Sequence, residues 1–318
     1  MTTSGTPAGT VLLAAPRGYC AGVERAIEIV ERALELYGPP VYVRKQIVHN
    51  QHVVAQLAGR GAVFVDELDE CPDGATVIFS AHGVSPAVRG EAERRGLFTI
   101  DGTCPLVAKV HAEARRYAGS GHPILLIGHA GHEEVDGTVG EAPASTRVFD
   151  PAADPASLPD LEGRSPVWLS QTTLAVEEVE AAVAGLRSRY PDLHDPPSED
   201  VCYASSNRQR AVKAIAPRCD LLLVVGSANS SNSVRLVEVA LQHGTPAAYL
   251  IDDASGLRPE WFAGVGTVGL TAGASAPETL VSGVLAALAE RGYAGVEEVR
   301  VAEETIEFTL PSVLKGRS

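Results

Sequence analysis

PRGYCAG, residues 16–22, lies between a short apolar run at 11–14 and a long amphipathic segment that begins at Val23. The apolar run predicts a buried strand, and apolar residues at helical spacing from Val23 to Leu34 predict a helix. Cys20 therefore stands where a strand gives way to a helix, and the free amides and dipole of a helix N-terminus stabilise a thiolate. The other interpretation of Cys20 is a small buried hydrophobe, which is the usual role of a free cysteine.

The composition narrows the classes of protein to consider. The chain has 318 residues, 45% of them hydrophobic, and a formal net charge of −14. This length predicts two or three domains, and the acidic balance argues against nucleic acid and anionic membranes, which need a basic face. No stretch approaches the roughly 20 apolar residues of a membrane span, and the polar start does not resemble a signal peptide. We therefore expect a cytoplasmic protein with reduced cysteines and neither a membrane nor a nucleic-acid partner.

Apolar runs bounded by glycine, proline and polar clusters predict an α/β protein. The predicted strands are 11–14, 41–43, 62–65, 76–80, 98–100, 124–127, 167–170, 221–225, 247–251 and 267–270. Helices are expected between many of these strands, among them 105–118 and 176–190. The glycine-rich segment 128–140 is expected to be a polar loop.

A repeat is visible in the spacing of polar loops behind three cysteines. The cysteines are Cys20, Cys104 and Cys202. A first polar loop follows them by 29, 28 and 28 residues, at His49, His132 and Ser230. A second follows by 62, 68 and 73 residues, at His82, Thr172 and Ser275. Each unit thus offers one cysteine and two polar loops, always where a strand ends.

The repeat predicts three similar α/β units with mainly parallel sheets around a pseudo-threefold axis, with the active site at the centre. Ligand sites form at the carboxyl ends of parallel strands, so such an arrangement would bring the three thiols together. The expected units are residues 21–103, residues 104–199, and residues 200–290 together with an N-terminal strand in 1–20; a C-terminal tail covers 291–318. Three unrelated α/β domains with similar spacing are the alternative.

Three converging thiolates could hold zinc with one open position, or an iron–sulfur cluster. Cys71 lies in a turn and Cys219 precedes a core strand, so both are interpreted as packing residues. The polar side chains expected around the three thiols are His49, His82, His132, Glu134, Thr172, Ser230, Ser231, Asn232 and Ser275. One carboxylate among many neutral or titratable donors favours a phosphate-bearing ligand, which helix N-terminal amides would also bind.

Ten motifs together resemble one known family. They are PRGYCAGV (16–23), IVHN (47–50), SAHGVS (80–85), DGTCPLV (101–107), AGH (130–132), QTT (171–173), CYA (202–204), NRQ (207–209), NSSNS (229–233) and TAGASAP (271–277). The resemblance is to the 4-hydroxy-3-methylbut-2-enyl diphosphate reductase family, also called IspH or LytB, and it runs from about residue 11 to 291. Glu133 stands where proline is common in that family, and serines at 205–206 where threonines are common. We expect neither departure to touch an essential position.

The resemblance implies an oxidoreductase that acts on an allylic diphosphate in the last step of the methylerythritol phosphate route to isoprenoids. It implies that a 4Fe–4S cluster is held by Cys20, Cys104 and Cys202, with an open iron for the C4 oxygen of the substrate. The residues implied to bind substrate are His49, His82, His132, Thr172, Ser230, Ser231, Asn232 and Ser275. Glu134 and Thr172 would form the proton path, and two electrons would arrive singly from a ferredoxin or flavodoxin. Water would leave, giving isopentenyl or dimethylallyl diphosphate.

Two other functions compete with this interpretation. A zinc-dependent hydrolase could use the same cysteines and histidines, and metal analysis would separate zinc from iron and sulfide. A sensor could bind a cluster without catalysis, but it would need neither Glu134 nor a diphosphate cradle at 230–232.

Overall fold

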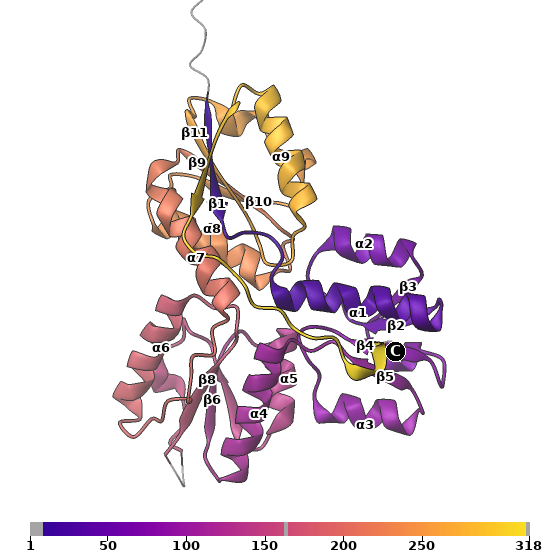
Figure 1. Ribbon diagram of the computed structural model, residues 1–318. Helices are drawn as coiled ribbons and strands as arrows, with labels where there is room; N and C mark the ends of the chain where they lie inside the picture. The colour runs from indigo at the N-terminus through magenta and orange to yellow at the C-terminus, as the bar shows by residue number, and fades with distance from the viewer. Residues whose placement is uncertain (1–8, 162–164, 316–318) are drawn as a thin grey trace, which may run out of the picture. The chain divides into compact units, whose positions relative to one another are not determined.

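The computed structural model of the protein describes residues 9–161 and 165–315, shown in Figure 1. The chain forms two compact units, and each is described by itself. The first unit comprises the described part of Met1–Cys20 together with His49–Val53 and Tyr203–Ile306. The second comprises Ala21–Val48, Val54–Cys202 and the described part of Glu307–Ser318.

The first unit contains one five-stranded parallel sheet in the order β10-β9-β11-β1-β12. Its strands are β1 (Thr10–Ala15), β9 (Leu221–Val225), β10 (Ala248–Ile251), β11 (Thr267–Ala272) and β12 (Gly295–Arg300), and its helices are α7 (Tyr203–Ile215), α8 (Ser231–Gln242) and α9 (Glu278–Glu290). Leu13 and Leu223 face α9, whereas Leu12 and Leu222 face α7 and α8. This alternation explains why these strands read as continuous apolar runs: both faces of the sheet are covered by helices.

The second unit contains two smaller parallel sheets. One has the order β3-β2-β4-β5, with strands β2 (Val41–Arg44), β3 (Ala62–Val65), β4 (Thr76–Phe79) and β5 (Phe98–Asp101). The other has the order β7-β6-β8, with strands β6 (Ile124–Ile127), β7 (Thr146–Phe149) and β8 (Val167–Ser170). The helices that accompany these strands are α1 (Ala21–Tyr37), α3 (Pro86–Arg94), α4 (Pro105–Gly119), α5 (Glu133–Glu141) and α6 (Val176–Arg189); helix α2 (Gln51–Gly59) follows His49.

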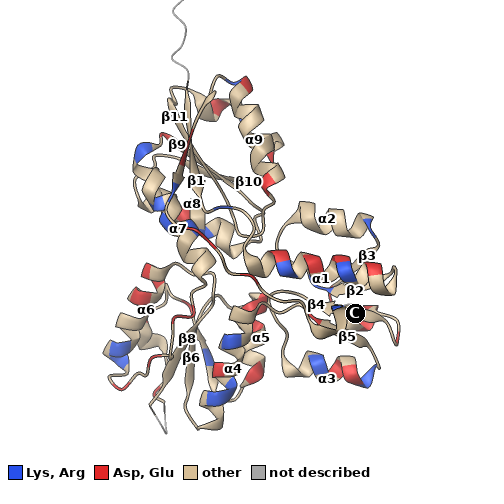
Figure 2. Cartoon of the chain, viewed as in Figure 1, with Lys and Arg blue, Asp and Glu red and all other residues tan. Residues whose placement is uncertain are grey.

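Both faces of the β7-β6-β8 sheet are covered. Leu125 and Ile127 pack against α6, and Ile124 and Leu126 pack against α4 and α5. Figure 2 shows charged residues gathered on helices such as α1, α3, α4 and α6. Apolar strands between charged helix faces are what the sequence pattern predicts for a parallel α/β protein.

The predicted α/β class is confirmed: all strand pairs among the described residues are parallel, and they form three sheets. The expected unit boundaries and the pseudo-threefold arrangement stay predictions. Among the strands and α-helices of the described residues, β7, β12 and α5 were not predicted. The expected loop at 128–140 is wrong over its second half, because α5 begins at Glu133. His132 caps that helix by accepting the Glu134 amide, and Val135 is buried on its inner face.

A fully buried arginine holds the turn that precedes Cys20. Arg208, on α7, has no exposed surface. Its guanidinium donates to the carbonyl oxygens of Gly18 at 2.7 Å, Tyr19 at 3.0 Å and Ala204 at 2.9 Å. It also pairs with Glu304 at 3.0 Å. The planar fork of the guanidinium suits this multiple contact, and the charge is compensated in place.

Arg208→Met should lower the free energy of unfolding by about 3–5 kcal/mol, because it leaves the Glu304 carboxylate and two turn carbonyls without their buried donor. Denaturant unfolding of the metal-free protein measures this loss. Arg210→Met is the matched control, since Arg210 is exposed on the same helix. An equal loss in both variants would contradict the role assigned to Arg208.

Candidate active site

The three predicted cysteines share one backbone arrangement. The Cys20 amide donates to Ala274 O at 3.3 Å, the Cys104 amide to Ala81 O at 3.0 Å, and the Cys202 amide to Thr172 O at 2.9 Å. Each acceptor belongs to a loop that carries a predicted site residue, namely Ser275, His82 and Thr172. Each cysteine is therefore tied to a polar loop at the carboxyl end of a parallel sheet.

Strand order explains this pairing. Cys104 follows β5, whose neighbour β4 leads to His82; Cys20 follows β1, whose neighbour β11 leads to Ser275. Cys202 follows a segment that pairs with β8 through the bridge between Val167 and His194. Neighbouring parallel strands end at the same edge, so a thiol and a polar loop meet there.

Burial separates the three cysteines from the other two. Cys20, Cys104 and Cys202 are half-buried, whereas Cys71 and Cys219 are buried. Burial raises the pKa of Cys71, and it raises the pKa of Cys219 to about 12. These two thiols stay protonated in the core, as expected for packing residues.

The single carboxylate of the predicted set is held by the predicted threonine. Glu134 is buried on α5, and its carboxylate accepts the Thr172 amide at 2.6 Å and the Thr172 hydroxyl at 3.1 Å. Burial, opposed in part by these hydrogen bonds, raises the pKa of Glu134. Because the Thr172 carbonyl accepts the Cys202 amide, one residue contacts both the carboxylate and a cysteine. A buried carboxyl group with a raised pKa is suited to hold and deliver a proton.

Two predicted histidines lie together in the second unit. The rings of His82 and His132 are 6.0 Å apart, edge to face. His82 Nδ1 lies 3.3 Å from Ser80 Oγ and 3.3 Å from Glu133 Oε2. The expectation that Glu133 touches no essential position is therefore wrong: its carboxylate contacts a predicted binding residue. No sequence signal pointed to this contact, because it joins the start of α5 to the loop after β4.

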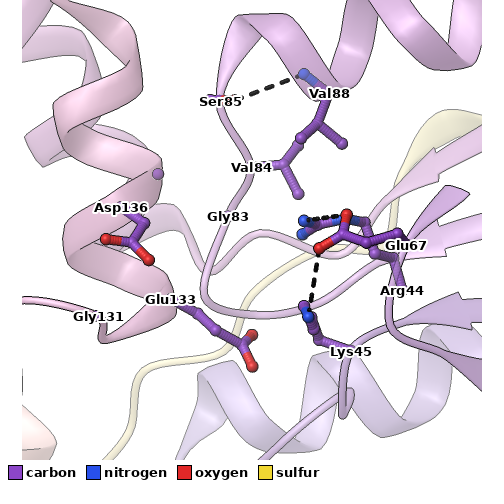
Figure 3. Close-up of a pocket in the computed structure, with 11 residues that line it drawn as sticks. Arg44, Lys45, Glu67, Gly83, Val84, Ser85, Val88, Gly131, Glu133 and Asp136 are labelled. Carbon is purple, nitrogen blue, oxygen red and sulfur yellow. Dashed lines mark hydrogen bonds and ion pairs between the residues drawn. The ribbon is translucent and has the colours of Figure 1, made fainter. Parts of the chain in front are cut away.

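Glu133 also lines a pocket of about 330 Å³ in the same unit (Figure 3). Glu133 and Asp136 lie on its α5 side, and Arg44 and Lys45 lie opposite, joined to Glu67. The Arg44–Glu67 ion pair is 2.8 Å long and the Lys45–Glu67 pair 3.3 Å. The pocket thus has an acidic and a basic wall.

Burial lowers the pKa of His132 from 6.5 to about 4, assisted by the nearby His82. His132 is therefore neutral at pH 7 in the folded protein but takes up a proton near pH 6.5 when unfolded. Since the unfolded chain binds more protons between pH 6.5 and 4, His132 makes the folded state less stable as the pH falls through that window.

The free energy of unfolding falls between pH 7 and pH 4.5 partly because of His132. In His132→Gln, this fall should be smaller by about 2 kcal/mol. Denaturant titrations of the metal-free protein at both pH values measure this difference. If the free energy of unfolding of His132→Gln depends on pH as it does in the parent protein, the neutral state assigned to His132 is refuted.

The remaining predicted residues lie in the first unit, where three loops meet. Ser275 Oγ donates to His49 O at 2.8 Å, and Asn229 Nδ2 lies 3.5 Å from His49 Nδ1. Ser230 is the N-cap of α8, and its hydroxyl accepts the Ser233 amide at 3.3 Å. The structure therefore brings His49, Ser275 and the start of α8 together; Ser231 is the first residue of that helix.

Asn232 is the clearest sign of a missing polar partner. The residue is buried, with 5% of its surface exposed, and neither Oδ1 nor Nδ2 has a hydrogen-bond partner among the described residues. Leaving such groups unsatisfied costs about 1–3 kcal/mol. At the N-terminus of α8, where the helix dipole favours negative charge, a polar ligand would satisfy this side chain.

Comparison with known proteins identifies the family. Residues 11–289 match the LytB protein family. The chain belongs to the LytB family. Curated LytB relatives include the 4-hydroxy-3-methylbut-2-enyl diphosphate reductases of Acidothermus cellulolyticus, 60% identical over 97% of this chain and 91% of the relative, and of Cutibacterium acnes, 59% identical over 96% and 94%.

Solved LytB-family structures agree with the fold. The E-1-hydroxy-2-methyl-but-2-enyl-4-diphosphate reductase of Plasmodium falciparum is 37% identical, with a TM-score of 0.93 over 97% of both chains. A second solved structure, described as (E)-4-hydroxy-3-methyl-but-2-enyl diphosphate reductase, the terminal enzyme of the non-mevalonate pathway, is 31% identical, with a TM-score of 0.63 over 89% of this chain and 99% of that one. Within the described residues of this LytB member, none of the helices has the length and apolarity to cross a membrane.

Proposed function

We propose that this LytB-family protein reduces (E)-4-hydroxy-3-methylbut-2-enyl diphosphate to isopentenyl and dimethylallyl diphosphate. The reaction breaks the C4–oxygen bond, takes up two electrons and two protons, and releases water. The observation that carries the proposal is the buried Glu134 carboxyl, held by Thr172 directly beside the Cys202 amide. An acid adjoining a thiol-bearing loop is what a reductive dehydroxylation needs, because hydroxide is a poor leaving group.

The three half-buried thiols fit an iron–sulfur cofactor. All three are partly exposed cysteines, and each backbone amide is fixed to a strand-end loop. Thiolates are the usual ligands of a 4Fe–4S cluster, and three of them leave one iron open. Cys20, Cys104 and Cys202 would hold such a cluster, which supplies electrons and a Lewis acid when bound.

The substrate diphosphate would be bound by polar side chains from several strand-end loops. The proposed residues are His49, His82, His132, Thr172, Ser230, Ser231, Asn232 and Ser275. The unsatisfied Asn232 amide and the N-terminus of α8 support this assignment, because both favour an anionic oxygen-rich ligand. Hydroxyl and imidazole donors would bind the phosphate oxygens against a global charge of −14, which salt screens beyond about 10 Å.

Proton delivery is assigned to Glu134 and Thr172. Burial raises the pKa of Glu134, which favours the protonated form relative to an exposed glutamate, so the carboxyl is suited to donate toward the departing hydroxyl. The Thr172 hydroxyl and amide hold the carboxyl in one orientation and stabilise it after the proton has left.

We also propose the wider setting of the reaction. The electron donor would be a ferredoxin or flavodoxin, which delivers single electrons, and the protein would act in the cytoplasm. The units expected at 21–103, 104–199 and 200–290 would surround the reaction centre about a pseudo-threefold axis.

Anaerobic turnover with reduced methyl viologen tests the function directly. We expect consumption of the hydroxy diphosphate, formation of both isoprenoid diphosphates, and stoichiometric iron and sulfide with a brown colour. Zinc without iron, together with the absence of reductive turnover, would instead favour a hydrolase built on the same cysteines and histidines.

A further inference from the structure

Lys109 connects the helix that follows Cys104 to the segment that leads to Cys202. Cys104 is the N-cap of α4, and Lys109 lies on the second turn of that helix. Its ammonium donates to Ser198 O at 3.1 Å, Glu199 O at 2.8 Å and Asp200 Oδ1 at 3.0 Å. The ammonium has three hydrogens, and these three acceptors use all of them.

Asp200 continues the connection to β8. Its side chain is completely buried, and Oδ2 accepts the Ser170 amide at 2.9 Å. Two residues later, the Cys202 amide donates to Thr172 O at 2.9 Å. The segment before α7 is therefore fixed at two points: to Ser170 at the end of β8, and to Thr172, the partner of Glu134, just after it.

We propose that Lys109 is the positioning residue that fixes Cys202 relative to Cys104 and to the Thr172 loop. The inference deepens the proposed function, since it takes these cysteines as cofactor ligands. All contacts that support it lie within the second unit.

The two acidic side chains around the Lys109 ammonium support the need for a cation at this position. Lys109 lies 3.0 Å from Asp200 and 3.9 Å from Glu113, whose side chains are 0% and 8% exposed. Burial raises the pKa of Glu113, and the neighbouring Asp200 raises it further. Removing the lysine would leave a buried carboxylate without its only cation within salt-bridge distance among the described residues. The contact thus differs from an exposed ion pair, which contributes little.

Residue-resolved amide hydrogen exchange on the cluster-free protein tests the proposal without using turnover. In Lys109→Met, we expect the protection of the Ser170 and Cys202 amides to fall by about tenfold or more, since both depend on the position of segment 198–202. Amides in the middle of β6, such as Leu125, should keep their protection. Arg116→Met is the matched control, because it removes a cation from the exposed face of the same helix.

Each outcome decides the question. Unchanged protection at Ser170 and Cys202 would overturn the proposal, and so would an equal loss at Leu125, which would mean general destabilisation. Should Lys109→Met fail to fold, Asp200→Asn keeps the size of the side chain and should show the same selective loss.

Iron content after anaerobic reconstitution gives a second readout. We expect less than about half of the parent iron in Lys109→Met and full iron in Arg116→Met. If neither the parent protein nor any variant binds iron, the proposed function is contradicted. The hydrogen-exchange result still decides whether Lys109 positions Cys202.

Discussion

Glu134→Gln should lower kcat by about 10²–10⁴-fold, the usual contribution of a general acid, while leaving the iron and sulfide content unchanged. The substitution preserves the shape of the side chain. The amide oxygen of glutamine can take the place of Oε1 and accept the hydrogen bond from the Thr172 amide. It removes the proton that Glu134, whose pKa is raised by burial, would donate. Steady-state turnover with reduced methyl viologen measures kcat, and metal analysis of the same sample measures the iron and sulfide content.

The control for this prediction lies on the same helix. Asp136→Asn removes an exposed carboxylate from the first turn of α5 and should change kcat by less than about twofold. Parent-like kcat in Glu134→Gln would remove Glu134 from proton delivery, and loss of iron would mean that its role is structural.

Cys20→Ser, Cys104→Ser and Cys202→Ser should each reduce bound iron from about four per chain to fewer than about one after anaerobic purification. A serine hydroxyl is protonated at neutral pH and is a much harder ligand than a thiolate, so one substitution weakens the whole cluster. Turnover should fall below detection together with the visible absorbance.

Cys71→Ala and Cys219→Ala are the matched controls. Both residues are buried and their thiol pKa values are raised, so their loss should leave iron content at the parent level. Full iron in all three serine variants would contradict the ligand assignment, and loss of iron in the two alanine variants would show that iron content follows stability alone.

The core of the fold could be predicted from single residues and their order. The apolar run of β9 predicts a strand buried on both faces, and the structure confirms it. The edge strand β12 was missed because GVEEVR is mostly exposed and carries three charges, so only its backbone pairing with β1 defines it. Helix α5 was missed because its glycines suggested a loop, although Glu133, Glu134 and Asp136 are typical of a helical first turn.

The sequence predicts the residues of the candidate site but does not predict the contacts among them. The spacing along the chain grouped Cys20 with His82. In the structure, the Cys104 amide instead donates to the loop that carries His82, because β4 and β5 are neighbours in one sheet. Strand order is a long-range property, and no local pattern encodes it. The contact between Glu133 and His82 likewise joins residues far apart in the sequence, so no local pattern predicts it.

The bond between each cysteine amide and the loop of a neighbouring strand also bears on how this protein could be recombined with a relative. A chimera whose crossover falls just before Cys104 would combine the Cys104 amide of one parent with the Ala81 carbonyl, and the loop that carries it, of the other. A crossover placed within α4, after Cys104, keeps the Cys104 amide and its acceptor loop in one exchangeable segment. Libraries built with the later crossover should therefore yield more folded, iron-binding hybrids.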